Sequence, residues 1–394
     1  MIWKKIRPTF QNAAVQVTFW GAYCALISYA SVYLQSRGLT DGQIGLVLAL
    51  GNGLSVILQP LAGNFADSCG RMVLRRVLAA CILPMLGLYF AVLAGASAPV
   101  CFILMIGLLQ TVLPLLYTLC TFYMDRGVDI RFGVSRGLGS LGYAALSTVL
   151  GRLVAAMGPG VTVWVGIITL LLLLLAVATF RFRGVSDEKP VPEKSDVSIV
   201  RFLSRNPRFS RTLAGAILAY VGYNVASNFL FQILSAQGLG AEELGYCLML
   251  SSLVELPTLF LLSFLNRHFF SGHLLKVGAV FLVVKTAAMI VATGFGGVMA
   301  AMALQILGYP LFASIGVYFV NQVIDETHRT LGQSLMNDTF TLSNVIACLL
   351  GGWLLDLYGV RAMLIVAAVI SATGAAIVIF FAQRGGKLPA RSVE

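Results

Sequence analysis

The sequence predicts an all-α membrane protein with twelve transmembrane helices in two six-helix halves. Its composition points this way first, because 58% of the 394 residues are hydrophobic and only 11% are charged. A soluble domain would carry roughly a quarter of its residues as charged side chains. The second observation is the number of long apolar segments, and the third is the placement of the basic residues between them. A spanning helix needs about 20 apolar residues, so the chain has room for about a dozen.

Twelve apolar segments follow one another along the chain. The first six lie at 12–35, 42–66, 73–94, 97–123, 133–156 and 160–180, and the second six lie at 210–235, 242–265, 274–294, 297–323, 331–355 and 360–382. The stretch between the two sets is rich in charged residues, Pro and Ser. We therefore predict an N-terminal half at 1–180, a cytoplasmic linker at 181–209 and a C-terminal half at 210–394.

The two halves also share a short pattern. Similar pentapeptides open the fifth and eleventh segments, at 132–136 and 331–335. Each is followed by a Leu-Gly pair, Leu150-Gly151 in one case and Leu350-Gly351 in the other. Similar helices at corresponding positions are expected of a transporter that is built from repeats.

The basic residues indicate the orientation of the chain. The formal net charge is +11, and all but five of the 27 Lys and Arg residues fall in the two tails or in the turns after even-numbered segments. The five exceptions are Arg37, Arg136, Arg152, Lys285 and Arg361. By the positive-inside rule, both termini are expected to be cytoplasmic. The excess of basic residues is thus explained by topology, and we expect no nucleic-acid partner.

The chain shows no signature of an enzyme. Its seven cysteines have no CxxC or CxxH spacing, so we expect neither a disulfide framework nor a metal site. No P-loop, HExxH or GxSxG motif occurs, and we expect no cofactor. The N-terminus is basic but lacks a short apolar segment with a small-residue cleavage site, so the first segment is expected to be an uncleaved helix of an inner-membrane protein.

Four charged residues fall within the predicted helices: Arg136, Glu255, Lys285 and Asp338. Each such charge costs about 2.5–3.5 kcal/mol on insertion scales, so it needs a structural or functional reason. Glu255 and Lys285 have opposite signs on neighbouring segments. They could form a permanent structural ion pair, or a pair that opens when a substrate or a proton binds.

Arg136 and Asp338 each have two interpretations. The planar guanidinium of Arg136 suits two hydroxyl groups or a carboxylate, but the residue could also be a juxtamembrane arginine of the positive-inside type. Asp338 could carry a proton, because burial favours the neutral form of a carboxylic acid. It could equally face a loop at the start of the eleventh segment. We predict coupling roles for Glu255, Lys285 and Asp338.

Several segments also carry uncharged polar residues at helical spacing. The first segment has Gln16, Trp20 and Tyr23, the fourth includes Tyr117, and the seventh has Tyr220, Asn224, Asn228 and Gln232. Such faces could line a wet central cavity or could hold packed helices together. Favouring the cavity, we predict that the substrate-binding residues are Arg136, Asn224, Asn228, Trp20, Tyr23 and Tyr117.

The turn between the second and third segments contains a motif that resembles a family signature. Gly63-xxx-Asp67-xx-Gly70-Arg71 resembles the signature found at this place in the major facilitator superfamily. Twelve segments with a long central loop resemble that superfamily over the whole chain. The resemblance implies its two-half fold and a gating role for Gly63, Asp67, Gly70 and Arg71 on the cytoplasmic side.

Further stretches resemble the lactose-permease branch, the oligosaccharide:proton symporters. They are residues 59–67 at the end of the second segment and residues 132–136 at the start of the fifth. The branch has an arginine at the position of Arg136, and that arginine binds sugar hydroxyls. Glu255 and Lys285 look like its charged residues in spans 8 and 9, with Lys in place of Arg.

This chain departs from the branch at other charged positions. The branch's span-4 glutamate falls near Tyr117 or Thr118 here, and its span-7 aspartates fall on Asn224 and Ser227. Its span-10 Lys, His and Glu fall near Gln305, Gly308 and Leu311. Lactose permease itself is therefore excluded, and its proton path cannot be transferred. If the protein is proton-coupled, Glu255 or Asp338 must carry the proton.

From these patterns we expect a monomeric secondary transporter of the inner membrane, not an enzyme. Its predicted activity is import of a sugar, glycoside or similar polar metabolite together with a proton by alternating access. An exporter of metabolites or amphipathic compounds on the same fold is the first alternative. A membrane sensor or scaffold that does not transport is the second, and it would be expected to carry a large added signalling domain.

Overall fold

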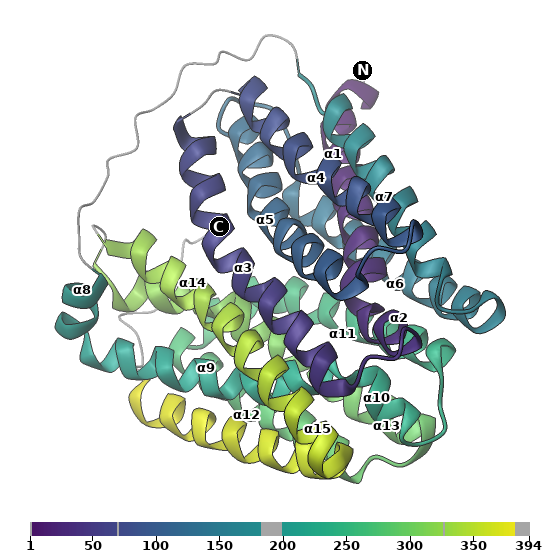
Figure 1. The fold of residues 1–394 in the computed structure, drawn as a ribbon. Helices are drawn as coiled ribbons and strands as arrows, with labels where there is room; N and C mark the ends of the chain where they lie inside the picture. The colour runs from purple at the N-terminus through teal and green to yellow at the C-terminus, as the bar shows by residue number, and fades with distance from the viewer. Residues whose placement is uncertain (1, 69–70, 183–198, 326–327, 383–394) are drawn as a thin grey trace. The chain divides into compact units, whose positions relative to one another are not determined.

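The computed structural model describes residues 2–68, 71–182, 199–325 and 328–382, and these are almost entirely helical (Figure 1). They divide into two compact units. The first unit contains α1 to α7 and the start of α11 up to Ser252, and the second contains α8 to α10, the rest of α11 and α12 to α15.

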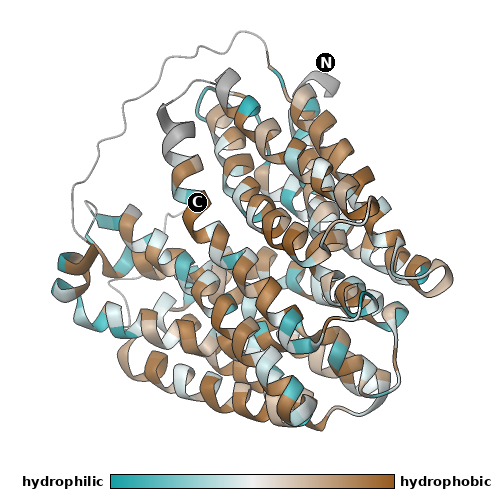
Figure 2. Ribbon diagram, in the orientation of Figure 1, coloured by the Kyte–Doolittle hydropathy of each residue, from teal (hydrophilic) through white to brown (hydrophobic). Residues whose placement is uncertain are grey.

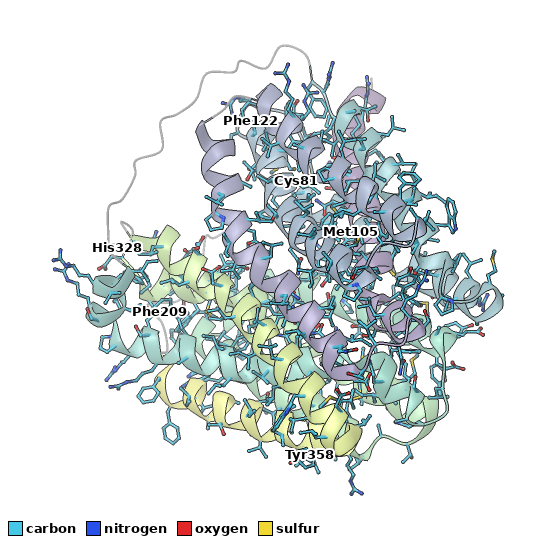
Figure 3. All side chains as sticks on the ribbon, in the orientation of Figure 1. Cys81, Met105, Phe122, Phe209, His328 and Tyr358 are labelled. Carbon is cyan, nitrogen blue, oxygen red and sulfur yellow. The ribbon has the colours of Figure 1, made fainter. Side chains whose placement is uncertain are left out.

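The helices of the first unit follow the predicted segments closely. They are α1 (Ile2–Tyr23), a π-helical turn (Cys24–Ser28), α2 (Ala30–Ser36), α3 (Asp41–Ser68), α4 (Arg71–Leu93), α5 (Ala98–Met124), α6 (Phe132–Met157) and α7 (Val161–Thr179). Met105 of α5 is fully buried within this unit (Figure 3).

The remaining helices are more often interrupted. They are α8 (Ile199–Arg205), α9 (Pro207–Asn228), α10 (Leu230–Ser235), α11 (Ala241–His268), α12 (Ser271–Val291), α13 (Gly294–Ala303), a 3₁₀ turn (Leu304–Leu307), α14 (Tyr309–Val323) and α15 (Arg329–Phe381). Phe209 of α9 is buried in the second unit (Figure 3).

Ten stretches of the described residues are long and apolar enough to cross a membrane. One of them, Leu331–Phe381, holds two predicted segments, because α15 is interrupted at Gly359 (φ 75°, ψ 179°). The more polar α9 with α10 corresponds to the seventh predicted segment. The described residues thus contain twelve passes, which we number in chain order, and hydrophobic residues predominate along most of them (Figure 2).

The turns after the odd-numbered passes share one backbone feature. Each contains a glycine with φ between 62° and 91°, a region that other residues rarely adopt. These glycines are Gly38, Gly95, Gly158, Gly238, Gly294 and Gly359. The sequence therefore specifies tight turns at the same places in both sets of six passes.

The first and seventh passes break in the same way. Pass 1 leaves helical geometry at Tyr29 (φ −103°, ψ 10°), and pass 7 does so at Phe229 (φ −107°, ψ 22°). The Tyr29 hydroxyl lies against Gly151, and the Phe229 ring lies against Gly351. A Cβ added at these glycines would come 2.9 Å from the hydroxyl and 2.5 Å from the ring. The two Leu-Gly pairs of the repeated pattern therefore accommodate equivalent aromatic side chains in the two units.

The second unit is packed most tightly where α9 lies beside the end of α15 (Figure 1). The Ser371 hydroxyl donates a hydrogen bond of 2.7 Å to the carbonyl oxygen of Ala219. A Cβ at Gly374 would overlap the backbone nitrogen of Ala219 and the carbonyl oxygen of Gly215. Backbone atoms cannot move aside as a flexible side chain can, so this approach requires glycine.

We predict that Gly374→Ala lowers the stability of the folded protein by about 1–3 kcal/mol, because α9 and α15 would have to separate. The measurement is the thermal unfolding midpoint of the detergent-purified protein. The matched control is Gly296→Ala in α13, where an added Cβ meets nothing within 4 Å. Equal midpoints for the two variants would contradict the packing described above.

Candidate functional site

Two of the charges predicted inside the membrane are joined by an amide in the second unit. Lys285 of α12 is only 1% exposed, and its Nζ donates a 2.6 Å hydrogen bond to Oε1 of Gln305. The Gln305 Nε2 then donates a 2.8 Å hydrogen bond to Oε1 of Glu255 on α11. The amide thus presents its oxygen to the cation and its nitrogen to the carboxylate, which suits an ionised Lys285 and an ionised Glu255.

The break in the tenth pass positions Gln305. The α-helix α13 ends at Ala303, and the 3₁₀ turn that follows contains Gln305, which is fully buried. The N–H of Gly308 donates a 2.8 Å hydrogen bond to the carbonyl oxygen of Gln305 and closes this turn. The sequence predicts that Glu255 and Lys285 pair, but it marks Gln305 only as a departure from the lactose-permease branch. The signal that could have identified it was a polar amide within an apolar segment.

Aromatic rings surround the Lys285 end of this chain of hydrogen bonds. The Lys285 Nζ lies 4.3 Å from the centroid of the Tyr223 ring. Tyr223 in turn stacks on Tyr309, with centroids 4.8 Å apart and an interplanar angle of 7°. Phe340 lies beside Tyr309, at 5.3 Å between centroids. The negative face of an aromatic ring attracts a cation, so Tyr223 adds to the stabilisation of the buried ammonium group.

A small pocket opens next to these rings, within the second unit. Its volume is about 90 Å³. The lining residues are Tyr220, Tyr309, Ala313, Val317, Gln333, Met336, Asn337 and Phe340. The lining thus combines aromatic rings with the amide groups of Gln333 and Asn337.

The two predicted asparagines of pass 7 contact pass 11. The Asn224 Nδ2 donates to the Ser343 hydroxyl at 3.3 Å, and the Asn228 Nδ2 donates to Oδ1 of Asn344 at 2.6 Å. These bonds connect α9 to α15, which is the helix-packing role that the sequence left open. A role of Asn224 and Asn228 in substrate binding stays a prediction.

The first unit brings Arg136 together with two other predicted residues. Arg136 of α6 donates from Nη1 to the Ser140 hydroxyl at 2.9 Å, and its guanidinium lies 4.3 Å from the Trp20 ring centroid. Trp20 packs against Tyr23 of α1 at 5.2 Å between centroids. It also meets Tyr143 of α6 edge-on at 6.4 Å. Arg136, Trp20 and Tyr23 therefore form one cluster between α1 and α6.

Another polar residue, Gln16, also lies between α1 and α6. The sequence predicts it as part of a polar stripe but not as a site residue. Gln16 of α1 is fully buried, and neither of its amide atoms has a hydrogen-bond partner among the described residues. The Trp20 Nε1, one turn further along α1, is also buried without a partner in the described part of the chain. One turn before Gln16, Asn12 donates a 2.7 Å hydrogen bond to the Ser135 hydroxyl.

Two further predicted residues lie elsewhere. Tyr117 of α5 packs edge-to-face on Phe132, at 5.4 Å between centroids, and does not join the polar contacts of Arg136. Asp338 of α15 is exposed, and its carboxylate is hydrogen-bonded to Ser334 one turn earlier. The predicted roles of Tyr117 in substrate binding and of Asp338 in coupling stay predictions.

The predicted gating turn is only partly described. Gly63 lies in α3, and an added Cβ there would meet nothing within 4 Å. Asp67 belongs to α3 and Arg71 begins α4, but their side chains, like all of Gly70, lie outside the described residues. The gating role therefore stays a prediction. Among the residues that the structure describes, no three His, Cys, Asp or Glu side chains gather as metal ligands would.

Comparison with known structures identifies the class of protein that this fold represents. The nucleoside transporter NupG is 15% identical with a TM-score of 0.76, covering 95% of this chain and 98% of its own. An auto-inhibited POT family peptide transporter is 13% identical with a TM-score of 0.73, covering 96% of each chain. A bacterial homologue of the human lysosomal transporter Spinster, inward-facing and unoccupied, is 12% identical with a TM-score of 0.69, covering 97% and 98%.

The fold is therefore that of the major facilitator transporters, as predicted: an all-α membrane protein of twelve helices in two halves. The chain belongs to the MFS_1 like family, whose model matches residues 13–366. A search of curated protein sequences finds no significant match. The superfamily prediction is confirmed, whereas the resemblance to the lactose-permease branch stays a prediction.

We predict that Gln305→Leu destabilises the protein by about 3 kcal/mol, because it removes hydrogen bonds to two charged groups in a buried place. The measurement is again the thermal unfolding midpoint in detergent. Gln35→Leu, at an exposed position of α2, is the control and should unfold like the unmodified protein. A Gln305→Leu variant with an unchanged midpoint would mean that the amide is not needed to hold Glu255 and Lys285.

Proposed function

We propose that this protein is a secondary active transporter that imports a small polar metabolite together with a proton by alternating access. The observation that carries the proposal is the buried chain of hydrogen bonds from Lys285 through Gln305 to Glu255. An ion pair kept only for stability gains little, because the cost of desolvating two charges offsets most of their attraction. Titratable residues within a membrane pass more often mark a substrate or proton pathway.

The arrangement suits Glu255 as the proton carrier. When its carboxylate is ionised, it accepts the Gln305 N–H and balances the charge of Lys285 across the amide. When a proton binds, that balance is lost, and the buried ammonium favours a different set of neighbours. The protonation state of Glu255 would therefore alter the packing of passes 8, 9 and 10 together. Asp338 is the other candidate, but its carboxylate is hydrogen-bonded to Ser334 on its own helix and is not connected to Lys285 in the described structure.

The proposal extends to the organisation of the molecule. The two halves at 1–180 and 210–394, joined by the linker at 181–209, would rock about a site near the middle of the membrane, as transporters built from repeats do. The matching breaks of passes 1 and 7 support two structurally equivalent halves. We propose that the protein acts as a monomer in the cytoplasmic (inner) membrane with both termini on the cytoplasmic side, where most of its basic residues fall.

The proposed cargo is a sugar, a glycoside or a similar small polar metabolite. Aromatic rings beside hydrogen-bonding groups occur in both units: Trp20 and Tyr23 near Arg136, and Tyr223 and Tyr309 near Lys285. Such surroundings suit a solute that presents an apolar face and polar edges. The resemblance of residues 132–136 to the sugar-binding helix of the lactose-permease branch supports the same class.

We predict that Glu255→Gln reduces accumulation driven by a pH gradient at least tenfold in proteoliposomes, because the amide cannot take up a proton. Exchange of labelled for unlabelled substrate needs no net proton movement and should continue. The matched control is Asp338→Asn, which should accumulate substrate normally. If Glu255→Gln accumulates substrate as the unmodified protein does, Glu255 is not the carrier, and loss in Asp338→Asn instead would assign the role to Asp338.

A further inference from the structure

The cluster around Arg136 differs from the one around Lys285 in how its charge is balanced. The positive charge of Lys285 is balanced by Glu255, to which Gln305 connects it through two hydrogen bonds. The polar contacts of Arg136 are the Ser140 hydroxyl and the Trp20 ring, and both of these groups are neutral. Among the described residues no acidic side chain pairs with Arg136. A guanidinium stays ionised in proteins, so this charge within a membrane pass has no counter-ion among the described residues.

The same cluster has unused hydrogen-bond donors. Arg136 donates a hydrogen bond from Nη1 to the Ser140 hydroxyl, and the other nitrogens of its guanidinium group have no hydrogen-bond partner in the described structure. The Gln16 amide and the Trp20 indole N–H are buried without partners among the described residues. The only unused acceptor of these three residues is Oε1 of Gln16. The Tyr143 hydroxyl is already engaged with the Ser28 hydroxyl at 2.8 Å.

Close packing of α1 on α6 places these groups together. Gln16 and Trp20 are one helical turn apart on α1, and both face Gly139 of α6. An added Cβ at Gly139 would lie 3.0 Å from the Cβ of Gln16 and 3.1 Å from Cδ1 of Trp20. Arg136 precedes Gly139 by three residues on the same helix, and its guanidinium lies over Trp20. The amide, the indole and the guanidinium therefore share one stretch of the interface.

We propose that the transported solute carries a carboxylate, and that Arg136, Gln16 and Trp20 bind it. This inference rests on the proposed transport function and narrows its cargo to acidic metabolites, such as sugar acids or small hydroxy acids. A carboxylate is an acceptor only, so it matches a site that is rich in donors and poor in acceptors. It also supplies the missing negative charge, and the fork of Arg136 can bind both of its oxygens.

A neutral sugar fits this cluster less well. Each sugar hydroxyl needs an acceptor for its proton as well as a donor. Gln16 gives a second reason, because a buried amide without partners loses the hydrogen bonds that it would make in water. A bound carboxylate would accept the Gln16 Nε2 donor and replace part of this loss.

The test compares matched ligands by their effect on the thermal unfolding midpoint of the purified full-length protein, since a ligand that binds the folded state raises it. The probes are glucuronate against glucuronamide and glucose, gluconate against glucitol, and 3-hydroxybutyrate against its amide. We expect at least one acid to bind tenfold or more tightly than its neutral counterparts. Proteoliposomes should then accumulate that acid under a pH gradient.

Three variants locate the site. Arg136→Gln should abolish the preference for the acid, whereas Arg136→Lys should keep the charge but bind at least fivefold more weakly, because it lacks the fork. Gln16→Met should weaken binding of the acid about tenfold and also raise the midpoint without ligand, because it removes an unpartnered buried amide. Gln35→Met on the exposed end of α2 is the matched control and should change neither quantity.

Several results would overturn the inference. They are equal binding of acid and neutral probes, no shift with any acid in the panel, or acid binding that is unchanged in both Arg136→Gln and Gln16→Met. In each case a neutral solute accumulated under a pH gradient would leave the transport proposal intact. If proteoliposomes accumulate no solute at all, the proposed function itself fails.

Discussion

The ammonium group of Lys285 is buried in a membrane pass and must be stabilised by its neighbours. The protein meets this requirement with Gln305, which accepts from Lys285 at 2.6 Å and donates to Glu255 at 2.8 Å, and with the Tyr223 ring. Side chains of three passes are thereby joined by two hydrogen bonds. In the first unit, the described contacts of Arg136 are all with neutral groups. One cation is therefore paired within the protein, and we propose that the other binds the carboxylate of the solute.

Much of the fold follows from the amino-acid sequence, because a bilayer requires about 20 apolar residues for each crossing. Apart from α1, which begins at Ile2 and not near residue 12, the helices correspond to the apolar segments within a few residues. Turn glycines such as Gly38 and Gly238 mark where passes end. The interruptions were not predicted. At Tyr29 and Phe229 the side chains contact Gly151 and Gly351, which are distant along the chain. Apolar periodicity carries no information about such contacts.

The candidate site could be predicted only in part. The cost of charge in a membrane identified Arg136, Glu255 and Lys285 from the sequence alone. The role of Gln305 depends on the 3₁₀ turn at Leu304–Leu307, which no motif indicates. Asn12 and Gln16 look equivalent in the sequence, one turn apart on the same helix. Asn12 meets the Ser135 hydroxyl whereas Gln16 meets Gly139, which has no side chain to offer, and only the structure separates them.

The central claim is that Glu255 carries the proton and that Gln305 links it to Lys285. Acid-induced infrared difference spectroscopy of the protein in lipid tests this most directly, because a protonated carboxyl group and a primary amide have separate carbonyl bands. On acidification we expect a protonated-carboxyl band that is lost in Glu255→Gln and kept in Asp338→Asn. A simultaneous shift of the amide band should disappear in Gln305→Leu. A carboxyl band that persists in Glu255→Gln would contradict the account.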